Sequence, residues 1–183
     1  MRIGIVYGSD TGVTEEVVSV FQETILDPEK ELVIIEVCDI ESTEDFLMFD
    51  LLILGLPTWY DGDLQSDWED YFDTFETIDF TGKIVAIFGL GDQIGYEEYF
   101  IDGVGILAES VLKNGGTLIG NWPSVGYQHL ASKALKDDHT FYGLALDEDN
   151  EHILTEERVE KWLKQLYAEH AKISETHHKI TTI

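Results

Sequence analysis

A short polar stretch near the N-terminus has the residue types of a binding site for an anion. It follows an apolar run that starts at Ile3, leads into a helical pattern, and reads Tyr7-Gly8-Ser9-Asp10-Thr11-Gly12-Val13-Thr14. At such a junction the backbone N–H groups, the hydroxyls and the positive end of the helix dipole all favour negative charge. The stretch contains no Lys or Arg. A phosphate group bound here would therefore be held by oriented dipoles and hydroxyls alone.

Three other interpretations of this stretch compete with a phosphate site. A nucleotide-hydrolysing P-loop needs a Lys and a Ser or Thr after its second Gly, and here Gly12 is followed by Val13 and Thr14. The triplet Asp10-Thr11-Gly12 matches that of the aspartic proteases, but it occurs once and opens a helix. On this stretch alone, the possibility that the glycines only form a tight turn stays open. The residues of the other loops must distinguish a phosphate site from a structural turn.

Composition restricts the class of protein. The chain has 183 residues, of which 44% are hydrophobic, enough for one domain with a full core. Eleven basic against 37 acidic residues give a net charge of −26, which argues against nucleic acid and anionic membranes and favours partners with basic faces. Cys38 is the only cysteine, so no intramolecular disulfide can form. The N-terminus enters a strand at once and no stretch approaches a membrane span, so we expect a cytoplasmic protein.

The hydrophobic pattern alternates between strands and helices. We expect strands at 2–7, 32–37, 51–54 and 83–88, and a fifth strand that begins at Thr117, is interrupted over 121–140 and resumes over 141–146. Helical spacing occurs at 14–26, 64–75, 100–111 and around 159–166. Such alternation predicts a three-layer α/β/α sandwich with a five-stranded parallel sheet of order 2-1-3-4-5. We expect a single domain over residues 1–170 and a mobile tail over 171–183.

In sheets of this kind the ligand lies at the carboxyl ends of the strands, near the point where the winding reverses. Two further loops should meet the first one there. They read Pro57-Thr58-Trp59-Tyr60-Asp61-Gly62-Asp63-Leu64-Gln65 and Gly89-Leu90-Gly91-Asp92-Gln93-Ile94-Gly95-Tyr96. Exposed Trp and Tyr side chains in glycine-containing loops beside a phosphate site form a slot for a flat aromatic ring. The sequence therefore predicts a planar, phosphorylated ligand.

Three motifs resemble the flavin mononucleotide (FMN) loops of the flavodoxins, in the same order. They are Gly8-Ser9-Asp10-Thr11-Gly12-Val13-Thr14, Pro57-Thr58-Trp59 and Gly91-Asp92-Gln93-Ile94-Gly95-Tyr96. The likeness covers about residues 1–170, and the interruption of the fifth strand is similar to the long-chain subgroup. The stretches 89–93 and 122–127 look particularly like the second flavodoxin of enteric-type bacteria.

The resemblance assigns the following residues to FMN. Ser9, Asp10, Thr11, Gly12, Val13 and Thr14 would hold the phosphate; Trp59 and Tyr96 would cover the two faces of the ring; Pro57, Thr58, Tyr60, Asp61 and Gly62 would line its edge; Leu90, Gly91, Asp92 and Gln93 would meet its pyrimidine side; and Asp149 would reach the ribityl chain. Two positions depart from the family pattern. Leu90 stands where relatives often have Thr, so only its backbone N–H is expected to contact the cofactor. Tyr60 replaces the Asn common in cyanobacterial relatives.

The resemblance implies a low-potential one-electron carrier. An acidic site without Lys or Arg disfavours the anionic, fully reduced flavin, and rotation of a flexible Gly62 backbone toward the ring N5 would stabilise the half-reduced semiquinone. The expected partners are a basic-faced, NADPH-dependent flavodoxin reductase and electron-acceptor enzymes, met transiently and guided by long-range charge. We expect the chain itself to be a monomer.

Other classes of protein share this fold or its loops. A response-regulator receiver shares the strand order, but its acidic and Lys positions are occupied here by Gly8-Ser9, Gly55-Leu56 and Gly120-Asn121. An FMN-dependent quinone or nitro reductase is the main alternative because it uses the same loops, although no second dinucleotide fingerprint is present. A binding module without cofactor is the third possibility. The histidines show no metal-ligand spacing, so we expect no metal site and no catalytic residues.

Overall fold

A parallel sheet forms the centre of the computed structural model, which describes residues 1–181, with side chains described through Thr176. Its main strands are β1 (Arg2–Tyr7), β2 (Glu31–Glu36), β3 (Leu51–Trp59), β5 (Ile84–Leu90) and β10 (Leu144–Leu146). Their spatial order is β10-β5-β3-β1-β2. Residues 51–56 of β3 and all of β5 are buried, as expected for strands covered by helices on both faces. The predicted order 2-1-3-4-5 is confirmed.

The fifth strand of the prediction consists of two pieces. β6 (Thr117–Leu118) pairs with the start of β5, and β10 pairs with its end. Between them the chain leaves the main sheet and forms an antiparallel sheet of β7 (Trp122–Pro123), β9 (Thr140–Phe141) and β8 (Leu135–Asp137). The predicted interruption is therefore a small folded insertion beside the main sheet.

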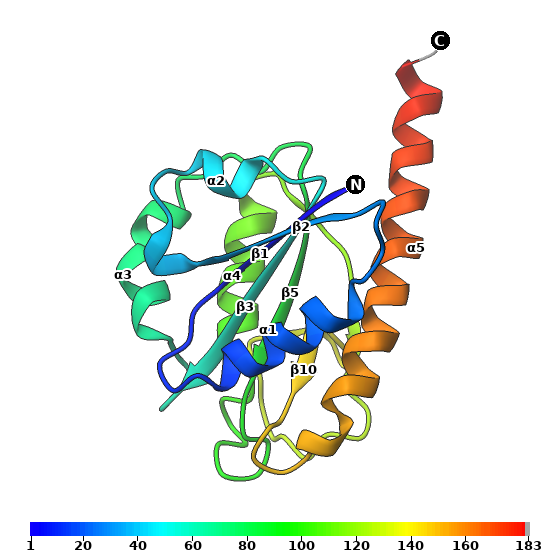
Figure 1. Cartoon of the computed structure of the whole chain (residues 1–183). Coiled ribbons are helices and arrows are strands. Elements are labelled where there is room, and N and C mark those ends of the chain that lie inside the picture. The colour runs from blue at the N-terminus through cyan, green and yellow to red at the C-terminus, as the bar shows by residue number, and fades with distance from the viewer. Residues whose placement is uncertain (182–183) are drawn as a thin grey trace.

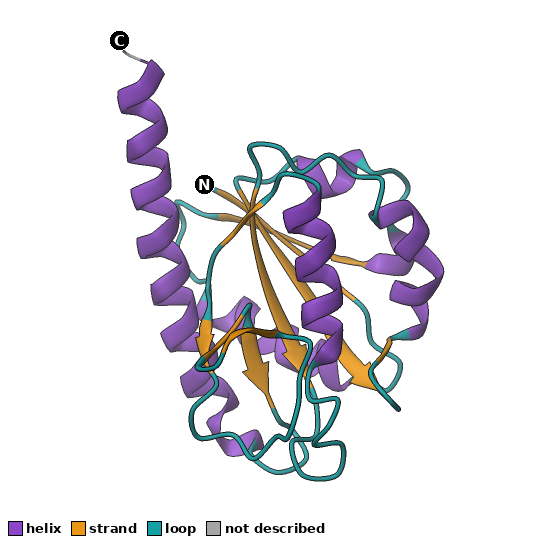
Figure 2. Ribbon diagram, turned by 180° about the vertical axis from the view of Figure 1, so that it is seen from behind, coloured by secondary structure: helices purple, strands orange, loops and turns teal. Residues whose placement is uncertain are grey.

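Helices cover both faces of the main sheet. α1 (Val13–Thr24) and α5 (Thr155–Thr181) lie on the face toward the viewer in Figure 1, whereas α4 (Asp102–Lys113) lies on the opposite face, which Figure 2 shows. α3 (Ser66–Phe75) lies beside the short helices η1 (Val37–Asp39) and α2 (Glu44–Leu47), and η2 (His152–Leu154) precedes α5. Aromatic rings join these layers: the ring of Phe21 lies 4.9 Å from that of Phe88 and 5.9 Å from that of Trp162.

The segment between β3 and α3 differs from the prediction. β3 continues to Trp59 instead of ending at Leu54, because residues 55–57 pair with β5 and β4 (Asp63–Leu64) folds back antiparallel onto Thr58 and Trp59. α3 starts at Ser66 instead of Leu64, because the Gln65 side chain accepts a hydrogen bond from the Trp68 N–H and caps the helix. The predicted aromatic stripe of this helix is confirmed as core, with Trp68 and Phe75 fully buried.

The C-terminal segment is helical although its residues show no amphipathic pattern. α5 continues to Thr181 and projects beyond the sheet (Figure 1). The segment 171–181 contains no Gly or Pro, so nothing stops a helix that has already formed further upstream. The mobility predicted for 171–183 stays a prediction, and residues 182 and 183 lie outside the described residues. Across the described part of the chain, no helix combines the length and apolar character needed to cross a membrane.

Candidate functional site

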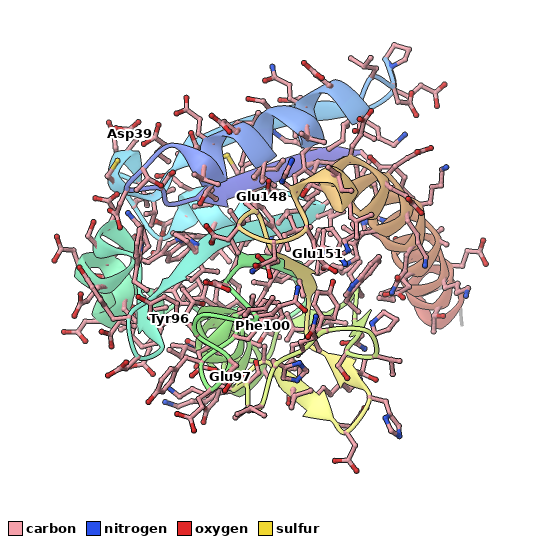
Figure 3. All side chains as sticks on the ribbon, turned by 90° about the horizontal axis from the view of Figure 1, so that it is seen from below. Asp39, Tyr96, Glu97, Phe100, Glu148 and Glu151 are labelled. Atoms are coloured by element: carbon pink, nitrogen blue, oxygen red, sulfur yellow. The ribbon has the colours of Figure 1, made fainter. Side chains whose placement is uncertain are left out.

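A cleft of about 930 Å³ opens at the carboxyl ends of the central strands. Figure 3 looks onto this edge and shows Tyr96 and Phe100 on the side of α4 and Glu148 on the side of α1. Twelve of the predicted site residues line the cleft: Thr11, Val13, Thr14, Pro57, Thr58, Trp59, Tyr60, Leu90, Gly91, Asp92, Tyr96 and Asp149. The three loops therefore converge as predicted.

Six predicted site residues do not line the cleft: Ser9, Asp10, Gly12, Asp61, Gly62 and Gln93. The Ser9 hydroxyl oxygen accepts a hydrogen bond from the Gly12 N–H (3.0 Å) and closes the first loop on itself. Gln93 is buried, donates to Asp147 Oδ2 (2.8 Å) and accepts from the Gln128 N–H (2.8 Å). Its side chain faces the insertion because these partners satisfy it there.

The first loop leaves backbone donors free at the amino end of α1. Gly12 precedes the helix with φ 87°, and no side chain caps the helix. The N–H groups of a first helical turn have no partner within the helix, so an uncapped start offers them to a bound anion. No Lys or Arg occurs among the residues that line the cleft, all of which belong to the described chain.

A second donor beside this loop has no acceptor. The indole Nε1 of Trp59 is buried and makes no hydrogen bond to the described residues. An indole N–H can only donate, and a buried donor without an acceptor is costly. The indole N–H lies near the Asp10 carboxylate and helps to lower the pKa of that carboxyl. The two groups nevertheless do not have the geometry of a hydrogen bond. The arrangement fits an anionic acceptor in the cleft.

Asp10 turns away from the cleft and fastens the first loop to α3. Its Oδ1 accepts hydrogen bonds from Gln65 Nε2 (2.9 Å) and from the Ser66 hydroxyl. Partial burial raises the pKa of the Asp10 carboxyl, but these hydrogen bonds outweigh burial and lower it overall. Gln65 is fully buried, and a Cβ added at Gly8 would overlap its Oε1. Only glycine therefore lets the loop lie this close to α3.

The second loop places aromatic rings at the mouth of the cleft. The ring centroids of Trp59 and Tyr60 lie 6.2 Å apart, and Tyr60 is 70% exposed. A hydrogen bond from the Gly62 N–H to the Trp59 carbonyl (3.1 Å) closes a turn in which Tyr60 has φ 44°. Gly62 itself is packed against α4, since a Cβ there would lie 2.6 Å from Asp102 Oδ2. The residue of this turn with an unfavourable backbone conformation is thus Tyr60.

The third loop is organised by Asp92. Its Oδ1 accepts hydrogen bonds from the backbone N–H groups of Ile94 (2.9 Å) and Gly95 (2.7 Å) and from Asn150 Nδ2 (2.9 Å). Partial burial raises the pKa of the Asp92 carboxyl, but the three hydrogen bonds outweigh it and the pKa is lowered. The carboxylate form therefore holds the loop that carries Tyr96, which is half exposed at the opening.

Several residues of the cleft were missed by sequence reasoning: Glu16, Val17, Val20, Tyr99, Phe100, Glu148, His152, Thr155 and Glu156. Val13, Val17 and Val20 recur at helical spacing, a signal that could have placed one face of α1 in the cleft. Nothing local marks Glu148, whose carboxyl pKa is raised by burial. Its neighbour Asp149, which the resemblance did assign to the site, has a carboxyl pKa raised by burial and by Asp92.

The close packing at Gly8 gives a prediction for stability. We expect Gly8→Ala to lower the free energy of unfolding by about 2–3 kcal/mol, because the new methyl group displaces the buried Gln65 and its hydrogen bonds. Gly82→Ala is the control: it has φ 76° and open space around the added Cβ, so it should cost about 1 kcal/mol of backbone strain. Urea unfolding of both variants measures the difference. Equal costs would contradict the proposed packing.

The hydrogen bonds of Asp92 give a prediction for pH. A carboxyl whose pKa is lowered on folding contributes stability above its unfolded pKa and loses it as the pH falls through the folded pKa. We expect Asp92→Asn to be less stable than the natural chain by about 1 kcal/mol near neutral pH, and the difference to shrink below the ordinary value of 3.8. Urea unfolding across this range, with the exposed Asp138→Asn as control, tests it. A pH-independent difference would contradict the assignment.

Comparison with known proteins agrees with this geometry. The sequence model of the Flavodoxin family matches residues 5–162. Flavodoxin 1 of Salmonella typhimurium is 48% identical over 166 residues, covering 91% of this chain and 93% of the relative, and the flavodoxin of Haemophilus influenzae is 47% identical over 169 residues, covering 91% and 94%. The crystal structure of Fusobacterium nucleatum flavodoxin bound to flavin mononucleotide has a TM-score of 0.84 at 32% identity and covers 92% of this chain and 98% of that chain. The finer likeness to a second enteric flavodoxin stays a prediction. The chain belongs to the flavodoxin family, whose members are electron-transfer proteins rather than enzymes.

Proposed function

We propose that this chain binds FMN in the cleft and acts, as a single cytoplasmic chain, as a low-potential one-electron carrier between a basic-faced, NADPH-dependent reductase and acceptor enzymes. One observation carries the proposal: free N–H donors and an indole N–H without a hydrogen-bond partner among the described residues lie at one end of a cleft that has aromatic rings at its mouth and no Lys or Arg among its described lining residues. The lone, exposed Cys38 is compatible with a reducing compartment.

The residues present fit FMN. Its phosphate would accept hydrogen bonds from the first turn of α1 and from Trp59 Nε1, donors for which the described residues provide no acceptor. Its flat ring would lie between Trp59 and Tyr96, which come from different loops on the same edge of the sheet. When bound, FMN supplies the one-electron redox chemistry.

The electrostatics of the cleft support a low potential. Glu16, Glu148, Asp149 and Glu156 line it, and no Lys or Arg does within the part of the chain that the structure describes. One carboxylate ~10 Å from a site that gains an electron, at an effective dielectric constant of ~20, disfavours the added charge by about 1.7 kcal/mol. That corresponds to roughly 70 mV for one electron. Several such groups therefore disfavour the anionic reduced ligand, although salt reduces the effect.

The surface around the opening supports docking of basic partners. Asp61, Asp63, Glu69, Asp70, Glu97 and Glu98 are exposed and Asp67 is partly exposed, all on the loops and helix next to the opening. Tyr60, Ile94 and Tyr96 are exposed by 70, 53 and 50%. An acidic rim around apolar side chains suits brief encounters in which charge guides the approach and apolar contact brings the redox groups close.

We expect electron transfer from a basic NADPH-dependent flavoprotein reductase to slow by at least ~10-fold between ~20 mM and ~500 mM salt, because screening removes the long-range attraction. Stopped-flow measurement of the FMN-loaded protein tests this. The double variant Glu97→Gln/Glu98→Gln should lower the low-salt rate several-fold, whereas Glu23→Gln/Glu29→Gln, away from the opening, should change it little. A rate insensitive to salt would contradict the steering proposal, and quinone turnover with NADPH in the absence of a reductase would contradict the carrier role.

A further inference from the structure

One buried carboxylate lies outside the cleft lining and has no role in the function proposed above. Asp102 stands in the first turn of α4 and is 2% exposed. Charged side chains are almost never buried to this extent unless they are paired and hydrogen-bonded, so the position requires a structural reason. Its two oxygens face two different segments.

Oδ1 of Asp102 faces the insertion. It accepts a hydrogen bond from the Lys133 N–H (2.7 Å), and Lys133 Nζ lies 3.4 Å from Oδ2. The insertion is docked closely at this point, because a Cβ on Gly105 would overlap the Lys133 carbonyl. Just before Lys133, the N–H groups of Leu130 (2.8 Å) and Ala131 (3.1 Å) donate to the Glu97 carbonyl, beside Tyr96. The insertion thus holds the third loop and the start of α4 together.

Oδ2 of Asp102 faces the turn of the second loop. It lies 2.6 Å from the position of a Cβ on Gly62, so the glycine backbone rests directly against the carboxylate. The next residue along α4, Gly103, donates its N–H to Thr58 Oγ1 (3.1 Å). The start of α4 therefore supports both ends of the turn that carries Trp59 and Tyr60.

This turn needs support because its backbone is unfavourable. Tyr60 has φ 44° and Gly62 has φ 93°, and a non-glycine residue in the left-handed region persists only where its surroundings fix it. Asp102 and Gly103 contact the turn on the side that faces away from the cleft and so fix its backbone. A change in how firmly they do so must alter the backbone groups that the turn presents to a ligand.

We propose that Asp102 is a positioning residue, which together with Lys133 forms a latch through which the insertion fixes the turn Trp59–Gly62 and sets the relative affinity of the cleft for oxidised and reduced FMN. This inference rests on the proposed binding of FMN in the cleft. The insertion thereby acquires a role in tuning the redox site, although it contributes no residue to the cleft lining.

Asp102→Asn tests the latch with little change of shape. The amide keeps an oxygen for the Lys133 N–H but turns an NH₂ group toward Gly62 and the Lys133 ammonium. Asp138→Asn, an exposed position on the same insertion, removes the same charge and is the matched control. FMN affinity of the apoprotein, the two one-electron potentials of the loaded protein and hydrogen exchange of the Gly62 N–H in the apoprotein are measured for each.

We expect Asp102→Asn to weaken FMN binding by about tenfold and to speed exchange of the Gly62 N–H by at least tenfold. We also expect Asp102→Asn to change the ratio of the affinities for two successive redox states of FMN by at least threefold. At 59 mV per tenfold change, this corresponds to a shift of about 28 mV in the one-electron potential. A general loss of stability weakens all redox states alike and cancels in that ratio. The control should change none of these quantities by more than twofold.

A double-mutant cycle separates positioning from the loss of a buried charge. Gly62→Ala places a methyl group against Asp102, so its effect on FMN affinity should differ by at least threefold between the natural and Asp102→Asn backgrounds. Additive effects, or a shift in potential without faster exchange at Gly62, would overturn the latch. Should Asp102→Asn not fold, Lys133→Ala replaces it in the same cycle. Failure of the natural apoprotein to bind FMN would instead overturn the proposed function.

Discussion

Holding an anion without a cation is the constraint on which this structure depends. The chain carries a net charge of −26, and none of the described residues that line the cleft is Lys or Arg. The donors that remain include backbone N–H groups at the start of α1, the hydroxyls of Thr11 and Thr14, and the indole N–H of Trp59. Partial charges of this kind act over a short range and must point in the right direction, so their positions have to be fixed before the ligand arrives.

Much of the structure near the cleft serves to fix these donors. Gly55 is central, because its carbonyl accepts hydrogen bonds from the Gly8 N–H (3.1 Å) and from Trp68 Nε1 (3.0 Å). The first loop, β3 and α3 are therefore joined at one buried atom. Gln65 adds a second connection between α3 and the first loop through Asp10. Each of these groups lies behind the loop rather than in the cleft.

The insertion supports the third loop in the same way, through groups that lie outside the cleft. Tyr127 accepts a hydrogen bond from Trp122 Nε1 (2.9 Å) and donates one to the Ala145 carbonyl (2.7 Å), which ties the insertion to β10. Burial raises the pKa of Tyr127 to about 12, so its hydroxyl stays protonated and able to donate. From this anchor the insertion reaches Gln93 and Asp102, one beside each ring-binding loop.

The parts of the fold that follow from local pattern could be predicted from the sequence. Apolar runs predicted the strands, the three loops after them supplied eleven residues of the cleft, and the family resemblance added Asp149. The supporting residues could not be predicted, because their partners are distant in sequence: Asp10 bonds to Gln65, and Asp102 bonds to Lys133. The assignment of Gln93 to the ligand stays a prediction; its side chain is directed to Asp147 and Gln128, and a motif shows position but not side-chain direction. β4 was missed because two residues show no periodicity.

The affinity of the apoprotein for FMN and for riboflavin, compared from ~20 mM to ~500 mM salt, tests the central claim most directly, since the two ligands differ by the phosphate. If dipoles hold the phosphate, FMN should bind more tightly than riboflavin at every salt concentration. The ratio of the two affinities should stay constant or grow with salt, because screening weakens only the repulsion between the phosphate and the surrounding carboxylates. A ratio that falls tenfold over this range would show that a cationic side chain holds the phosphate and would contradict the account.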